Sequence, residues 1–520
     1  MPMHPRFIVA ALALLCAAGP ATTAADADAP AHPPMERWYV LLIGDERVGH
    51  AHFIQRANDE GHIVTENRSV MDIRRGPVEM RIEQASTFTE TADGGPLRAT
   101  ARLLAGGSEQ EQTLRFTDAG AELTHVQAGR TSTTAVDLDD DWLAPAAAQR
   151  QVIDAIDAGQ DRITVRTFDL AAGPRPFVTT MTRVGPAEVE LFGRVAPATA
   201  WDSTVSILPG ITTRSYLDEL GHALKTTIAF MPGMEITVLA ADRDLALAEV
   251  DPPELLAALF IQLDEPLPNP RQLRQATFRL RFNTPPAEHG FALPSVGYQR
   301  VTAEPDDAET PDTFTIELDL DRPVTPAPDD RPTDADRAAS PMIDHEDPKV
   351  RELLDQALGD DADTLSQAET AERLRRFVYD YITEKDLSVG LGSASETART
   401  AQGDCTEHAV LLAALLRAAD IPARTATGLL YVERFLGRDH AFGGHMWTQA
   451  WLDTDAGPAW LDLDPTFPPH RPYSATHITF ATSPMAAGEL TNDLVAIVPM
   501  LTGLQIELLE PAAAGEAPTR

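Results

Sequence analysis

The residues of this sequence that could perform chemistry together are one cysteine, one histidine and one aspartate: Cys405, His445 and Asp464. Cys405 follows Asp404, which can act as an N-cap, and Glu407 can complete a capping box with it. The apolar stretch over residues 409–416 then predicts a buried helix. The positive end of a helix dipole stabilises a thiolate in the first turn. The sequence therefore predicts a reactive cysteine at the start of a helix.

Two strands after this helix are predicted to carry the histidine and the acid. Residues 445–452 have the pattern of a strand that begins with His445, and residues 459–464 that of a strand ending in Asp464. A thiolate attacks a carbonyl carbon while a histidine, held in place by an acid, transfers the proton. These elements therefore indicate acyl chemistry on an amide or an ester.

The four segments that resemble the transglutaminase-like superfamily, in the order of that family, are 403–409, 416–424, 445–447 and 460–466. The resemblance covers residues 340–485 and implies a papain-like core. It places Cys405 at the nucleophile position, His445 at the base position and Asp464 at the acid position. We expect no cofactor and assign no metal ligands.

Small departures from the family pattern lie outside these three positions. Met446 stands where the family usually has alanine, and Gln449 where an acid is common. The backbone N–H of Cys405 is the expected first donor to an oxyanion. No tryptophan lies shortly upstream of Cys405, so the second donor known in the animal enzymes has no evident equivalent.

Other residues compete for the same roles. His408 lies one helical turn from Cys405, but a base there would lack an orienting acid on an adjacent strand. His440 lies five residues before His445, in a predicted loop. Asp462 alternates with the acid two residues later, so both could face the same way. The family positions favour His445 and Asp464 over these alternatives.

The N-terminus has the pattern of a secretory signal. Arg6 precedes an apolar stretch at 7–19, and small residues at 21–25 offer a cleavage site. We therefore expect a periplasmic or secreted protein with no integral membrane span in the mature chain. Cys16 would leave with the signal, so Cys405 would be the only thiol of the mature protein. A buried, inert cysteine is the alternative interpretation of Cys405 taken alone.

The composition limits the classes of partner. The formal net charge is −37 over 520 residues. Such acidity argues against binding to nucleic acid or to an anionic membrane surface. We expect a peptide or protein substrate instead, and the sequence gives no prediction of the oligomeric state.

The fold class predicted is α+β, with a papain-like catalytic domain after a large antiparallel β-rich region. The expected segments are a signal peptide at 1–25, a β-rich N-terminal domain at 36–250, a connecting β region at 251–321, a linker at 322–339, a transglutaminase-like catalytic domain at 340–485 and a C-terminal extension at 486–520. The linker is rich in Pro, Asp and Arg, which predicts an exposed segment between folding units.

Smaller features of the sequence carry weaker predictions. Residues 143–158 are expected to be the one helix of the β-rich domain. His50 and His52 alternate on one strand face, but no third ligand is in view, so we expect polar surface residues and no metal. Residues 433–444 are expected to form a loop that could act as a lid over the substrate.

The function expected from these residues is an exported, thiol-dependent hydrolase of amide bonds, acting through a thioester on Cys405. Water as the acyl acceptor gives hydrolysis, and an amine as the acceptor gives cross-linking. A different class also stays open, namely a non-catalytic binding or assembly protein that uses the papain-like domain as a scaffold.

Overall fold

The computed structural model describes residues 34–511, apart from the gaps 77, 118–119, 128, 140, 208–210, 232–233, 255–259, 290, 305–309, 363, 386, 388, 390–391, 472, 487–500 and 502. The predicted signal peptide therefore lies outside the described residues. The chain forms two compact units. The N-terminal unit comprises Met3–Arg74 and Glu79–Pro253, and the C-terminal unit comprises Arg75–Val78 and Glu254–Arg520.

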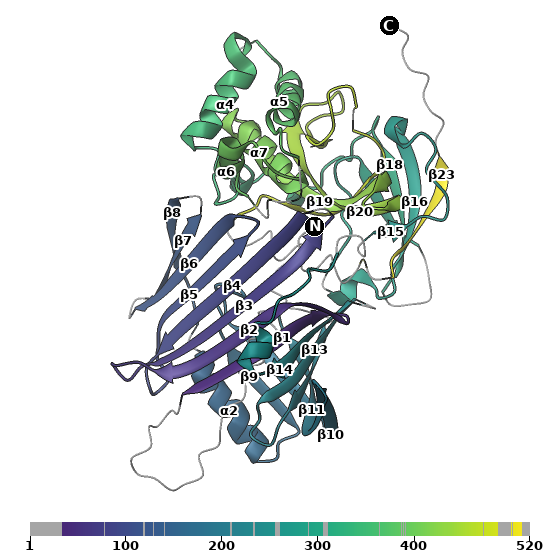
Figure 1. The fold of residues 1–520 in the computed structure, drawn as a ribbon. Helices are drawn as coiled ribbons and strands as arrows, with labels where there is room; N and C mark the ends of the chain where they lie inside the picture. The colour runs from purple at the N-terminus through teal and green to yellow at the C-terminus, as the bar shows by residue number, and fades with distance from the viewer. Residues whose placement is uncertain are drawn as a thin grey trace. The chain divides into compact units, whose positions relative to one another are not determined.

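The N-terminal unit is built on one antiparallel sheet of fourteen strands (Figure 1). Strands that follow one another in the chain pair with each other, except β8 and β9, which are the two edges of the sheet. Because β1 pairs with β14, the sheet runs from β8 through β1 and β14 to β9. The strands are β1 (Met35–Ile43), β2 (Glu46–Ala57), β3 (Ile63–Arg75), β4 (Val78–Glu90), β5 (Pro96–Ala105), β6 (Ser108–Thr117), β7 (Gly120–Gln127), β8 (Arg130–Val136), β9 (Arg162–Thr167), β10 (Phe177–Leu191), β11 (Arg194–Val205), β12 (Thr212–Leu217), β13 (Ala223–Met231) and β14 (Met234–Ala241).

Helix α2 (Pro145–Asp157) is the helix expected at 143–158. Its N-terminus has no side-chain cap from its own N-cap residue, and Glu90 accepts the backbone N–H groups of Ala146 and Ala147 at 2.9 and 3.1 Å instead. A carboxylate at this end also complements the helix dipole. A hollow beside the helix is lined by Gln149 and Asp169, among others. None of the predicted catalytic residues lines it.

The two histidines on β2 have local partners. Nε2 of His52 lies 2.8 Å from the carboxylate of Glu36, and its ring stacks on Trp38 with centroids 3.7 Å apart. Among the described residues, the one cluster of possible metal ligands contains neither His50 nor His52.

The C-terminal unit contains two antiparallel sheets. The strands of the first, in spatial order, are β15 (Ile261–Gln262), β20 (Arg438–Leu452), β19 (Ala423–Phe435) and β22 (His477–Ser483), with β21 (Ala459–Leu463) also paired to β20. The strands of the second are β17 (Gln299–Ala303), β18 (Thr313–Asp319), β16 (Gln275–Arg281) and β23 (Gln505–Pro511). Aromatic side chains join the two sheets, because Phe278 packs edge-on against Phe442 with centroids 5.5 Å apart.

Helices cover the first sheet of this unit (Figure 1). They are α4 (Pro348–Leu358), α5 (Gln367–Tyr381), α6 (Ala394–Thr400) and α7 (Cys405–Ala418). Helix α7 packs on β19 and β20, and the other three helices contact α7. Every residue of α7 after Cys405 is buried, as its all-round apolar pattern predicts. With 48% strand and 19% helix in separate parts of the chain, the α+β class is confirmed.

The remaining helices are short. They are α3 (Arg243–Ala246) and the 3-10 turns η2 (Pro270–Gln272), η3 (Pro286–His289), η4 (Pro328–Asp330), η5 (Asp334–Asp336) and η6 (Gly359–Asp361). Within the described part of the chain, no helix has the length and apolar character needed to cross a bilayer.

The division of the chain differs from the predicted linker at 322–339. The two units meet in the sequence at Pro253, and the predicted linker lies inside the C-terminal unit. Asp330 accepts a hydrogen bond from Arg424 at 2.7 Å, and its carbonyl accepts the indole N–H of Trp460 at 2.7 Å. Most residues of 322–339 are exposed, as their composition predicts, but Asp330 ties the segment to the strands of the C-terminal unit.

The predicted lid at 433–444 is wrong in its secondary structure, because these residues continue β19 and β20 as a hairpin. Leu436 and Gly437 form its turn with φ of 48° and 77°. Two successive positive φ values are what a tight two-residue hairpin turn requires. The segment is thus part of the sheet that carries His445.

Candidate active site

Cys405 is fixed at the start of α7 by the predicted capping box. Asp404 accepts the backbone N–H of Thr406 at 2.9 Å, and its own N–H donates to Glu407 at 2.9 Å. Gly403 precedes the box with φ of 149°, and a Cβ there would lie 2.2 Å from Cβ of Glu407. Only glycine fits this close approach. The cysteine is therefore held in the first helical turn, where it is partly exposed.

Glu407 ties this turn to the preceding loop. Its second carboxyl oxygen accepts the backbone N–H of Gly392 at 2.8 Å, and the side chain is completely buried. Burial, together with the nearby charge of Asp404, raises the pKa of Glu407 well above its usual range. The residue thus braces the backbone around Cys405.

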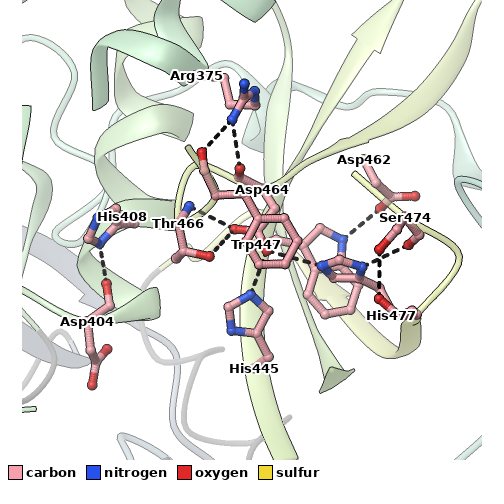
Figure 2. Close-up of polar contacts among 12 residues, drawn as sticks. Arg375, Asp404, His408, His445, Trp447, Asp462, Asp464, Thr466, Ser474 and His477 are labelled. Atoms are coloured by element: carbon pink, nitrogen blue, oxygen red, sulfur yellow. Dashed lines mark hydrogen bonds and ion pairs between the residues drawn. The ribbon is translucent and has the colours of Figure 1, made fainter. Parts of the chain in front are cut away.

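His445 and Asp464 are directly bonded (Figure 2). His445 lies on β20, and Asp464 directly follows the end of β21 at Leu463. Nε2 of His445 lies 2.8 Å from Oδ2 of Asp464, and their side chains are 9% and 0% exposed. Because a carboxylate accepts, the histidine carries its proton at Nε2. Its Nδ1 atom is then left for the thiol.

The charges of the site reinforce one another. Burial by itself lowers the pKa of His445, but the Asp464 carboxylate and a hydrogen bond to Cys405 raise it to about 10. Burial also raises the pKa of Asp464, but the facing histidines hold it well below its usual range. The structure therefore brings Cys405, His445 and Asp464 together, and we call them the triad. Their arrangement suits a thiolate and imidazolium pair held by a carboxylate.

Backbone and side-chain donors hold the acid of the triad. Oδ1 of Asp464 accepts the backbone N–H of Thr466 at 2.8 Å and its hydroxyl at 2.6 Å. The buried guanidinium of Arg375 on α5 donates to the carbonyl of Phe467 at 2.9 Å and to that of Asp464 at 3.3 Å. Glu372, one turn earlier on the same helix, pairs with this guanidinium. The role of Arg375 could not be predicted from the sequence, because nothing local marks an arginine that binds the backbone of a distant loop.

A second histidine, His477, also faces the acid (Figure 2). It is the first residue of β22, and its side chain is 0% exposed. Nε2 lies 3.1 Å from Oδ2 of Asp464, and Nδ1 lies 3.0 Å from the carbonyl oxygen of Ser474. His477 was not predicted from the sequence either. Its one signal is a histidine directly before the strand-forming residues Ile478, Thr479 and Phe480, thirteen residues after the acid.

His445, Asp464 and His477 could also be considered as metal ligands, since one donor atom from each lies within 4.8 Å of the others. Nε2 of His445 and Nε2 of His477, however, both lie at hydrogen-bonding distance from the same oxygen, Oδ2 of Asp464, at 2.8 and 3.1 Å. A structural zinc site takes four ligands in tetrahedral geometry. The arrangement is therefore that of two imidazoles donating to one acid.

The competing histidines have other partners. Nδ1 of His408 lies 2.6 Å from the carbonyl of Asp404, and its Nε2 lies 3.2 Å from the ammonium of Lys385. Burial above all, and also Lys385, lowers the pKa of His408 to about 4, so it stays neutral. His440 lies 3.1 Å from the hydroxyl of Tyr431. Neither histidine bonds to the acid that holds His445.

Asp462 is buried and serves a neighbouring network. Its Oδ1 accepts the indole N–H of Trp447 and the amide of Gln449, both at 2.8 Å. Gln449 in turn accepts from Arg424 at 2.9 Å. The ring of Trp447 stacks beside His445, with centroids 6.0 Å apart. Asp462 therefore contacts the triad only through this tryptophan, and the departure at Gln449 is part of the same network.

Comparisons with known proteins agree with the position of the site. The family profile described as the transglutaminase-like superfamily matches residues 353–465, a range that includes the whole triad. No curated protein matches the chain.

Several solved structures are distantly similar. A proposed cysteine protease from Cytophaga hutchinsonii is 16% identical with a TM-score of 0.27, over 45% of this chain and 81% of that chain. A proposed protease from Parabacteroides distasonis is 11% identical with a TM-score of 0.18, over 68% and 64% of the two chains. A beta-barrel-like protein from Brucella abortus, from a domain family of unknown function, is 15% identical with a TM-score of 0.32, over 40% and 96%.

Proposed function

Because residues 353–465 form a domain of the transglutaminase-like superfamily, we propose that this chain is a thiol-dependent acyl-transfer enzyme that hydrolyses peptide or isopeptide bonds. The observation that carries the proposal is the hydrogen bond of 2.8 Å from His445 to Asp464, together with the influence of Cys405 on the pKa of the same histidine. An isolated buried cysteine would need neither partner.

The first half of the reaction forms a thioester. Sγ of Cys405 attacks the carbonyl carbon of the substrate, and the carbonyl oxygen takes up the electron pair. The backbone N–H of Cys405, in the first turn of α7, stabilises this oxyanion. The intermediate then collapses, the carbon–nitrogen bond breaks, and the imidazolium of His445 protonates the leaving amine. Asp464 keeps the ring in the orientation and tautomer that this transfer needs.

The second half returns the enzyme to its starting state. Neutral His445 takes a proton from water as the water oxygen attacks the thioester carbon. The carbon–sulfur bond then breaks, and a carboxylic acid leaves with the thiolate restored. An amine in place of water would give a new amide and thus transamidation. Hydrolysis is the simpler reaction, because water needs no second binding site.

The substrate class and the location are part of this proposal. A peptide or protein substrate fits an acyl-transfer site on a chain whose net charge of −37 disfavours nucleic acid. The N-terminal pattern at 1–25 supports export to the periplasm or the medium.

Incubation with a peptide library and a fluorescent primary amine, analysed by mass spectrometry, tests the reaction type. We expect cleaved peptides with wild-type protein and none with Cys405→Ala. Labelled peptides in place of cleaved ones would show transamidation. If neither forms, and Cys405 alkylates no faster than free cysteine near neutral pH, the chain is a non-catalytic scaffold.

A further inference from the structure

His477 faces a hydrogen-bond acceptor at each ring nitrogen. Nδ1 lies 3.0 Å from the carbonyl oxygen of Ser474, and Nε2 lies 3.1 Å from Oδ2 of Asp464. A carbonyl oxygen can only accept. The histidines that face Asp464 outweigh the effect of its burial and hold its pKa well below the usual range, so its oxygens also accept.

A neutral imidazole has one N–H, whereas an imidazolium has two. In a neutral His477, one ring nitrogen would carry a lone pair that faces an acceptor about 3 Å away. This is unfavourable in a site without solvent. We propose that His477 is a buried imidazolium that shares the charge of Asp464 with His445 and thereby sets the pH range in which the triad works. This proposal deepens the proposed function and rests on it, and it makes His477 a positioning residue.

Aromatic rings around His477 suit a buried cation. Tyr473 stacks on the imidazole with centroids 4.1 Å apart and an angle of 20°. Trp447 and Phe467 lie at 5.2 and 5.5 Å, nearly perpendicular to it. Cations are attracted to aromatic faces, most strongly where solvent is excluded. Burial raises the pKa of Tyr473 well above its usual range, so this ring stays uncharged and adds no opposing charge of its own.

The charged groups that face His477 come from β20 and from β21 with the residues that follow it. Asp464 follows β21 and is hydrogen-bonded to His477. Asp462 lies on β21, and the charge of His477 lowers its pKa, whereas burial raises it. His445 on β20 is the second cation, with ring centroids 5.9 Å apart. Two carboxyls thus face two imidazoles, and Asp464 is bonded to both.

The sign of the effect follows from this arrangement. Without the charge of His477, the full charge of Asp464 acts on His445, which then holds its proton up to a higher pH. Removal of this positive charge also withdraws a stabilising influence from the thiolate of Cys405. We therefore expect the curve of the Cys405 alkylation rate against pH to shift to higher pH on both its sides, which we call its limbs. An opposite or like charge within about 4–6 Å shifts a titration by about 1–3 units.

Alkylation of Cys405 by iodoacetamide measures this profile without a substrate. The peptide that carries Cys405 is followed by mass spectrometry, so Cys16 does not interfere. His477→Gln keeps a donor for Asp464 but removes the charge, and His440→Gln is the matched control outside the triad. We expect both limbs to move up by about one pH unit or more in His477→Gln only. A uniform loss of rate with unmoved limbs would overturn the proposal.

Neutron diffraction from wild-type crystals tests the charge itself and requires no variant to fold. In crystals near neutral pH we expect deuterium on both ring nitrogens of His477, since each faces an acceptor. A bare nitrogen would refute the proposal. Neither measurement depends on peptide cleavage. If the protein does not hydrolyse peptides, a shift of the alkylation profile in His477→Gln would still support the role of His477. Conversely, cleavage with an unshifted profile would reject only the role of His477.

Discussion

Asp462 accepts the indole N–H of Trp447 at 2.8 Å, and Trp447 lies beside the imidazole of His445. These contacts distinguish Asp462, which lies on β21, from Asp464, which follows the end of that strand two residues later. One carboxyl holds the histidine directly, and the other holds the ring that packs against it. The two can be told apart by their effects on activity and on stability.

Asp464→Asn should lower the rate of peptide hydrolysis by roughly 10²- to 10⁴-fold, since the tautomer and orientation of His445 are disturbed. Asp462→Asn should leave this rate within a few-fold of wild type. It should lower the free energy of unfolding by about 1 kcal/mol, because a buried hydrogen bond is weakened. Kinetics on a peptide from the library and urea denaturation measure the two effects. A harmful Asp462→Asn beside a silent Asp464→Asn would show that the acid is wrongly assigned.

Cys405→Ala should abolish hydrolysis and leave the free energy of unfolding nearly unchanged, since only a small, partly exposed side chain is shortened. His445→Ala should lower the rate by roughly 10³-fold or more. It should also slow alkylation of Cys405 near neutral pH, because the stabilising imidazolium is gone. The double variant should be no slower than Cys405→Ala, since the two residues act as a unit. Full activity of Cys405→Ala would contradict the proposed mechanism.

The raised pKa of His445, about 10, also predicts how stability depends on pH. A histidine whose pKa is higher in the folded than in the unfolded state, where it is about 6.5, stabilises the fold most fully below that lower value. Its contribution is lost as the pH rises through the folded value. The free energy of unfolding should therefore fall as the pH approaches 10, and less steeply in His445→Gln. Denaturation at a series of pH values checks this, with His440→Gln as control.

Gly403→Ala tests the backbone that positions Cys405. A Cβ at Gly403 would lie 2.2 Å from Cβ of Glu407, whereas at Gly457, which also has positive φ, nothing lies within 4 Å. Gly457→Ala is therefore a control for backbone strain alone. We expect Gly403→Ala to be less stable than this control by about 1–3 kcal/mol. Its Cys405 should also alkylate more slowly, and equal behaviour of the two variants would show that the turn can relax.

The local parts of the site could be predicted from the sequence. Asp404 and Glu407 of the capping box are three residues apart, and the apolar residues that follow predict a buried helix. Helix α4 has the same kind of local signal, since Asp347 caps it and proline follows.

Distant contacts left no such local signal. His477 and Arg375 meet Asp464 only through the packing of β22 and α5 around its loop. β8 has no clear strand signal, because its residues are mostly polar and exposed and show no alternation of apolar residues. β23 pairs with β16 across more than two hundred residues, which makes the predicted connecting region and C-terminal extension parts of one sheet.

The segment 322–339 offers the last test, because its composition predicts an exposed linker while its bonds predict protection. The guanidinium of Arg424 donates to Asp330 at 2.7 Å and lies 4.0 Å from the ring of Trp460, and its side chain is 9% exposed. Breaking a buried pair leaves an uncompensated charge and destabilises a protein far more than loss of a surface pair does. Arg424→Gln should therefore loosen the segment.

Limited digestion with a low-specificity protease measures this loosening, since trypsin would lose a cleavage site in the variant. We expect 322–339 to be protected in wild-type protein and to be cut early in Arg424→Gln. Arg434→Gln is the matched control, because its ion pair with Asp439 lies on the surface, with the arginine 79% exposed. Its digestion should follow that of wild type. Early cleavage of the wild-type chain within 322–339 would instead support a linker between two folding units.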